Sequence, residues 1–263
     1  MPRRVRPVSH EDQLTLVEHL DELRHRLIVC LVVFAVALAL CFWQNHLLLE
    51  IAQSPLPSGH KKLITFGVTE PFTTTLTVSA YGAAILSAPF ILWELYAYVL
   101  PAFSPSERRV VLPVLLLFPL LFVAGVAFGY LAVMPAALHF LLGFNDQQFD
   151  VQVRAGEYYS FFSMTMLACG LVFQLPLVIL AVTRLGIVRI DQLTGNRRYA
   201  YLLIAIIAAA LPGVDPVSML IEMVPLLVLF ELSIVLARWF GRPHEGATER
   251  DGSRSGPEPG GVS

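Results

Sequence analysis

The sequence predicts an all-α integral membrane protein with six transmembrane helices in a kinked and cupped bundle. Hydrophobic residues make up 56% of the 263 residues, charged residues only 14%, and the mean hydropathy is +0.67. A soluble domain usually carries about 25% charged residues, so this chain lacks the charge to cover a soluble globule. Its apolar residues fall in membrane-length runs, and its basic residues gather in alternate loops. The composition excludes a soluble enzyme, a disordered chain and a basic nucleic-acid binder.

Six apolar runs are expected to cross the membrane as helices. A hydrocarbon core about 30 Å thick needs roughly 20 residues, and lipid cannot satisfy an open strand edge. The runs are residues 27–43, 76–98, 110–133, 159–183, 199–211 and 217–237.

Prolines and one short run predict the kinked, cupped shape. Proline lies within or beside most of the runs, and each interior proline removes an N–H donor and bends its helix. The fifth run would be only about 20 Å long, so the membrane thins there or the helix sits off-centre. Two long outer loops, residues 44–75 and 134–158, separate the runs on one side.

The basic residues predict that both termini are cytoplasmic. With six spans, fifteen of the eighteen Lys and Arg residues fall on the side of the termini. The opposite loops hold Lys61, Lys62 and Arg154. Such asymmetry marks the cytoplasmic side. Residues 1–26 are then a cytoplasmic amphipathic segment, 27–237 the membrane domain, and 238–263, rich in Gly, Pro, Ser and Glu, a disordered tail.

Three carboxylates are expected at the cytoplasmic face. Glu22 belongs to an amphipathic helix in which Arg26, four residues on, lies within reach of an ion pair. Glu107 follows Ser104 and Pro105 in a capping-box pattern before the third run. Glu94 lies near the cytoplasmic end of the second run. Each carboxylate therefore has an ordinary structural interpretation, and together they also suit a cationic partner.

Polar residues inside the predicted membrane domain need a separate explanation. Gln174 and Glu231 interrupt apolar runs, while Glu222 and Asp215 lie nearer the outer boundary. Ionisable groups at this depth are costly and mark a pathway or a partner surface. One alternative is a secondary transporter of a small solute with Gln174, Glu222 and Glu231 at its site, although the chain shows no internal repeat.

Signatures of catalysis and metal binding are missing from the sequence. It contains no HExxH, GxSxG or P-loop motif. The three cysteines all lie in apolar runs without CxxC spacing, which favours buried thiols over a disulfide or metal site. We therefore expect neither an enzyme nor a cofactor nor a bound metal.

Several motifs occur in order along the chain. They are EHLDELRHR at residues 18–26, SPL at 54–56, TEPF at 69–72, LPAFSPSERR at 100–109, FQLP at 173–176 and DPVS at 215–218. Together they resemble the TatC family, the multi-spanning receptor subunit of the twin-arginine protein translocase, and the first is similar to its HLxELRxR signature. The resemblance covers roughly residues 10–240.

This resemblance implies the site and the partners. Glu22 and Glu107 would bind the paired arginines of an export signal peptide, because a carboxylate meets the planar guanidinium fork bidentately and lysine offers no such fork. The residues implied to share this site are Glu94, Arg24, Leu23 and His19. The other implied motif residues are Pro55, Glu70, Pro71, Phe72, Pro101, Arg108 and Asp215.

The family also implies the wider assembly. Its members work in the prokaryotic cytoplasmic membrane with single-span TatA- and TatB-type subunits, export folded proteins by the proton-motive force, and form homo-oligomers within a receptor complex. The short fifth run and the polar sixth run would dock partners. Four positions depart from the family pattern: Glu94 stands where many relatives have Gln, Gln174 where many have Glu, Tyr98 where Phe is usual, and Met219 where Gln is usual.

Overall fold

The protein is a bundle of helices in the computed structural model. The structure describes residues 10–99, 105–144, 148, 151–184, 194–210 and 216–240, and side chains within 20–98, 117–144, 148, 151–183, 194–210 and 216–235. The helices are α1 (His10–Trp43), α2 (Asn45–Gln53), η1 (Ser58–His60), α3 (Glu70–Val99), α4 (Pro105–Phe128), η3 (Gly129–Val133), α5 (Met134–Gly143), α6 (Ala155–Val172), α7 (Leu175–Arg184), α9 (Arg197–Ala210) and α10 (Pro216–Phe240).

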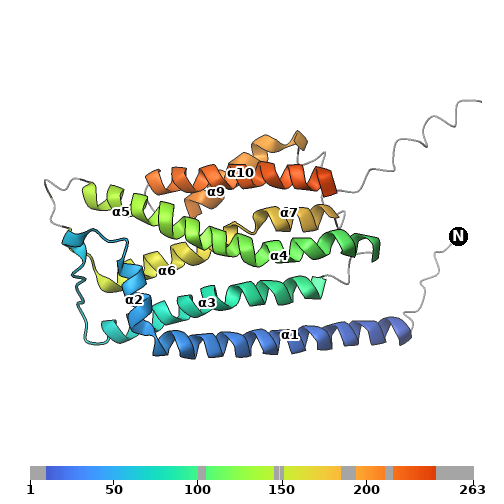
Figure 1. The fold of residues 1–263 in the computed structure, drawn as a ribbon, viewed down its shortest axis with the longest axis horizontal. Coiled ribbons are helices and arrows are strands. Elements are labelled where there is room, and N and C mark those ends of the chain that lie inside the picture. The colour runs from blue at the N-terminus through green and yellow to red at the C-terminus, as the bar shows by residue number, and fades with distance from the viewer. Residues whose placement is uncertain are drawn as a thin grey trace, which may run out of the picture.

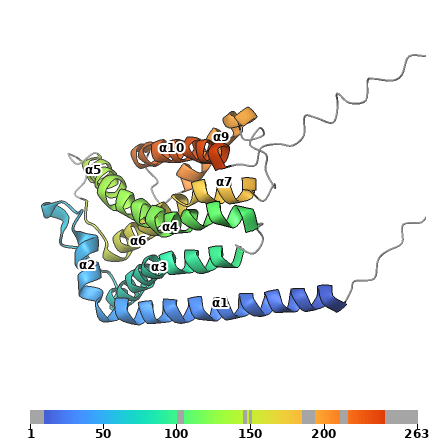
Figure 2. The same ribbon diagram turned by 45° about the vertical axis from the view of Figure 1, so that its right-hand side comes forward.

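The helices pack side by side with α1 and α9 on opposite sides of the bundle (Figures 1 and 2). α1 packs on α3, α3 packs on α4 and α6, and α10 packs on α7 and α9. The first turn of α1 and the last turn of α10 lie at the same end of the bundle (Figure 1). The start of α9, with Arg197 and Arg198, and the last turns of α3, which Arg26 of α1 contacts through Glu94, also belong to this end. We call it the basic end.

Five helical stretches in the described part of the chain are long and apolar enough to cross a membrane. They are Leu20–Trp43, Glu70–Tyr98, Leu117–Gly143, Ala155–Thr183 and Pro216–Val235. Many of their large apolar side chains are exposed, including Leu31 at 65% and Leu120 at 62%, as expected for helices that face lipid. The expected fifth run is α9, a helix of 14 residues or about 21 Å.

The third run continues farther than the sequence predicts. It ends at Gly143 rather than at residue 133, so α5 occupies the start of the expected outer loop. In an α-helix the Pro135 ring would clash with the preceding turn. Here η3 is a π-helical turn in which the Met134 N–H donates to the Gly129 carbonyl, and this wider turn carries the chain past the proline.

Prolines interrupt other spanning helices. The fourth run is two helices, α6 and α7, which break at Phe173 and Gln174, just before Pro176. Pro89 lies inside α3 and Pro225 inside α10. The second and fourth runs also begin earlier than expected, at Glu70 and Ala155, because polar first turns extend each helix beyond its apolar stretch.

Glycines allow α4 and η3 to approach α6 closely. A Cβ added to Gly125 would lie 2.6 Å from the Cys169 carbonyl oxygen, and one added to Gly170 would lie 2.7 Å from the Phe122 ring. Gly129, four residues after Gly125, faces Cys169 and Met166. The small-residue spacing therefore serves helix packing. Cys169 is buried there, and all three cysteines are free.

Candidate functional site

An arginine at the basic end joins two carboxylates from different helices. On α1, Arg26 Nε and Nη2 donate to Glu22 Oε1 at 3.0 and 2.7 Å. Its Nη1 donates to Glu94 Oε2 on α3 at 2.6 Å. We call Glu22, Arg26 and Glu94 the acidic bridge. It contains two carboxylates and one guanidinium, so its formal charge is −1.

The acidic bridge depends on the packing of α1 against α3. Glu22 and Arg26 face the same way because residues four apart share one side of a helix. α3 brings Glu94 to the same place, although it lies 68 residues from Arg26 in the chain. The side chains of Arg26, Glu94 and Glu22 are 25%, 21% and 39% exposed, so the bridge is open to its surroundings on one side.

The other residues predicted for this site are only partly described. Leu23 and Arg24 are exposed on α1 next to the acidic bridge. Glu107 and Arg108 lie in the first turn of α4, and His19 on α1, but their side chains fall outside the described residues. Pro101 and Asp215 lie outside the described residues altogether.

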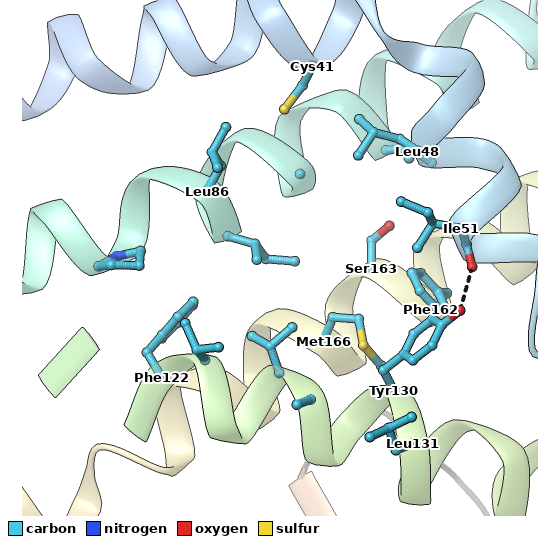
Figure 3. A pocket seen from close by; sticks show the side chains of 17 residues that line it. Cys41, Leu48, Ile51, Leu86, Phe122, Tyr130, Leu131, Phe162, Ser163 and Met166 are labelled. Atoms are coloured by element: carbon cyan, nitrogen blue, oxygen red, sulfur yellow. Dashed lines mark hydrogen bonds between the residues drawn. The ribbon is translucent and has the colours of Figure 1, made fainter. Parts of the chain in front are cut away.

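An apolar recess lies deeper in the bundle, between α1, α2, α3, α4, η3 and α6 (Figure 3). Its volume is about 640 Å³. It runs along α3 from Val78 to Pro89, and Leu86 and Val123 are exposed at its edge. Tyr130 and Ser163 supply its few polar atoms. Nothing in the sequence predicted this recess, because its walls come from segments far apart in the chain.

α2 forms the wall of the recess farthest from the basic end. Hydrogen bonds with tyrosine hydroxyls hold it in place. Tyr130 donates to the Ile51 carbonyl at 3.3 Å (Figure 3), and Tyr158 donates to the Ala52 carbonyl. Gln53 donates to the Tyr159 hydroxyl at 2.6 Å. The two tyrosine bonds end on carbonyls in the last turn of α2, where a helix leaves carbonyls without intrahelical partners.

The far end of the bundle is held together around Glu70. Its carboxylate accepts bonds from the Phe66 N–H at 2.8 Å, Arg154 Nε at 2.9 Å and the Gly156 N–H at 3.3 Å. Ile64 also pairs with the segment before α6, where its N–H donates to the Val153 carbonyl at 3.0 Å. Glu70 therefore links the loop between α2 and α3 to the segment at the start of α6.

Burial and charge both suit Glu70 to a structural role. Glu70 is 9% exposed, and its hydrogen bond raises the pKa of Arg154 above the ordinary value. A Cβ at Gly156 would lie 3.1 Å from Glu70 Oε1, so any side chain there would press on the Glu70 carboxylate. The neighbouring motif residues Pro71 and Phe72 are exposed, and Pro55 is half-buried in the turn after α2.

The three intramembrane polar residues have separate surroundings. Gln174 is buried, and its Nε2 donates to the Phe118 carbonyl at 3.2 Å. Glu231 accepts a bond from the Tyr201 hydroxyl at 2.6 Å and pairs with Arg197 at 3.5 Å, on the α9 side of α10. Glu222 is buried, 3% exposed. None of the three lines the apolar recess.

The described residues contain no group of three or more His, Cys, Asp or Glu side chains arranged to hold a metal ion. The candidate site consists of the acidic bridge, between α1 and α3 at the basic end, and the apolar recess farther along α3.

Comparison with known proteins identifies the family. Residues 18–225 match the family described as Sec-independent protein translocase protein (TatC). The TatC of Carboxydothermus hydrogenoformans is 36% identical over 238 residues, which are 90% of this chain and 98% of the relative. The chloroplastic TATC of Arabidopsis thaliana is 33% identical over 222 residues, 84% of this chain and 65% of the relative.

Solved structures agree. A crystal structure of the twin arginine translocase receptor TatC aligns with a TM-score of 0.73 at 31% identity and covers 85% of this chain and 100% of that one. Relatives named in this way are transport components rather than enzymes. This chain therefore belongs to the TatC family of membrane-embedded, Sec-independent protein translocase proteins.

Proposed function

We propose that this chain is the signal-peptide receptor and core of a twin-arginine translocase. It binds paired-arginine signal peptides at the basic end of the bundle and takes part in exporting folded proteins, with the proton-motive force as the energy source. Family membership and the acidic bridge support this proposal. Glu107, at the start of α4, is the further carboxylate that the second arginine needs.

The observation that carries the proposal is the order of two features along α3. Glu94 of the acidic bridge comes first, and Pro89 at the edge of the apolar recess lies five residues deeper, about 7.5 Å along the helix. A signal peptide has the matching order, with basic residues followed by an apolar stretch. We infer that the arginines meet the carboxylates while the apolar stretch lies along the recess and the surrounding lipid.

We also propose six spans with both termini in the cytoplasm. α9 is the sixth span, and the bilayer thins beside its 14 residues. The clustering of arginines at the basic end supports this orientation. Residues 1–26 then form the cytoplasmic N-terminal segment, 27–237 the cupped membrane domain and 238–263 a disordered cytoplasmic tail.

The proposed partners follow from the same family role. TatA- and TatB-type single-span subunits dock on the surface of α9 and α10, where Arg197, Tyr201 and Glu231 place polar groups on an otherwise apolar exterior. The receptor complex is a homo-oligomer in a prokaryotic cytoplasmic membrane.

Binding of signal peptides to the purified full-length protein in lipid nanodiscs tests the receptor function. We expect an Arg-Arg peptide to bind at least about tenfold more tightly than its Lys-Lys counterpart, because charge-assisted guanidinium contacts favour arginine. Glu22→Gln and Glu107→Gln should each weaken binding of the Arg-Arg peptide.

Glu50→Gln is the matched control. It removes one exposed carboxylate from α2, far from the basic end, and should leave the affinity unchanged. Equal affinities for the two peptides in the unmodified protein would contradict the receptor proposal.

A further inference from the structure

We propose that Arg26 is a positioning residue that holds Glu22 and Glu94 together as one acceptor for an incoming guanidinium. This inference rests on the proposed receptor function and adds a role for a residue that does not itself contact the ligand. Arg26 is the only described side chain that bonds to both carboxylates.

The geometry leaves acceptor atoms available. Both bonds from Arg26 to Glu22 end on Oε1, and the bond to Glu94 ends on Oε2. No hydrogen bond from a described residue reaches Glu22 Oε2 or Glu94 Oε1. One oxygen of each carboxylate can therefore accept a bond from a second guanidinium while Arg26 keeps the other.

Electrostatics explains why the carboxylates need Arg26. Glu22 and Glu94 carry like charges on neighbouring helices, and without a cation between them they repel and turn apart. With Arg26 in place the acidic bridge keeps a formal charge of −1. It still attracts a cation, and both carboxylates stay in one place.

The exposed fractions of Glu22 and Arg26 indicate that Arg26 positions the carboxylates rather than competing with the ligand for them. Glu22 is the most exposed member at 39%, whereas Arg26 is 25% exposed. An arriving guanidinium meets the Glu22 carboxylate first and has no need to displace Arg26. If Arg26 were a competitor, it would have to leave before the ligand bound, and its removal would tighten binding.

Paired substitutions in the full-length protein in nanodiscs test this inference with the Arg-Arg peptide. We expect Arg26→Gln to weaken binding about fivefold, in line with a partly exposed ion pair. Arg26→Lys should recover part of the loss, since its ammonium keeps the charge without the fork. Glu94→Gln alone should weaken binding about two- to threefold.

The decisive measurement is the double variant. Glu94→Gln removes one of the two repelling charges, so in the Arg26→Gln background it should tighten binding, the reverse of its effect alone. The positioning role would be overturned if the loss of affinity in the double variant equalled the sum of the losses in the two single variants. It would also be overturned if Arg26→Gln alone tightened binding.

A control and the unmodified protein separate the possible failures. Arg198→Gln removes a basic-end arginine that lies over the Tyr199 ring, and it should leave the affinity unchanged. If the unmodified protein failed to prefer Arg-Arg over Lys-Lys, the receptor proposal itself would fail. If that preference held and the double variant showed simple additivity, only the inference about Arg26 would fail.

Discussion

Arg26 and Arg154 each bond to two carboxylates, at opposite ends of the bundle and in different surroundings. The partners of Arg26 are partly exposed, and one oxygen of each accepts no bond from a described residue. The main partner of Arg154 is Glu70, which is 9% exposed and also accepts bonds from two backbone N–H groups. The first arrangement is open to a ligand, whereas the second joins loops of the same chain.

Residue-level prediction succeeded where partners lie close together in sequence. The four-residue spacing of Glu22 and Arg26 is enough to indicate their ion pair, because it places both side chains on one side of a helix. The bond between Arg26 and Glu94 could not be predicted, because it needs the packing of α1 on α3. The role of Glu70 also escaped prediction, since its partners Arg154 and Gly156 lie more than 80 residues away.

Glu70→Gln should destabilise the far end of the bundle. The neutral amide no longer pairs with Arg154, and it cannot accept from all of its present donors at once. We expect the thermal unfolding temperature of the detergent-solubilised protein to fall by about 2–4 °C. Glu157→Gln is the control, because that side chain is 75% exposed and makes one bond to Arg154 at 3.2 Å. Equal shifts for both variants would show that burial at Glu70 has no special importance.

At the level of helices, hydrophobic runs predicted which segments cross the membrane. Gly125 and Gly129 have the four-residue spacing typical of tight helix contacts, and the structure places both against α6. The π-helical turn η3 and the break at Phe173 and Gln174 were not predicted. Proline shows that a helix must adjust, but the surrounding packing decides between a wider turn and a break.

Gly125→Ala should loosen the contact between α4 and α6. The added methyl would lie 2.6 Å from the Cys169 carbonyl oxygen, which belongs to the backbone and cannot rotate away. We expect a loss of about 1–3 kcal/mol in the free energy of unfolding, measured by denaturant titration in detergent.

Gly143→Ala provides the matched control at the end of α5. A Cβ there meets no atom within 4 Å, so the same substitution should leave stability nearly unchanged. If Gly125→Ala left the free energy of unfolding unchanged, α4 and α6 would be able to move apart at little cost in free energy.

For the whole molecule, composition and charge distribution predicted a helical membrane protein, and this prediction is confirmed by the family match and the spanning helices. The count of six spans stays a prediction, because α9 is too short to be recognised as a span by length. Sequence patterns give the length of an apolar run, but they do not say how the bilayer adapts to a short one.

The proposed orientation can be measured with single cysteines in a cysteine-free variant of the protein. Lys61→Cys should react with a membrane-impermeant maleimide in intact cells, because residue 61 lies at the end of the bundle opposite the basic end. Arg198→Cys should react only after the membrane is permeabilised. The reverse pattern would place the basic end outside and contradict the receptor proposal.

The hydrogen bonds that hold α2 in place also limit what one copy of this protein can do. The recess is open along the lipid, but α2 closes it on the side away from the basic end, with Tyr130 and Tyr158 bonded to its last turn. A polypeptide that entered the recess from the basic end would meet α2 and could go no farther. If the protein exports folded proteins as proposed, their passage must therefore form outside this single subunit.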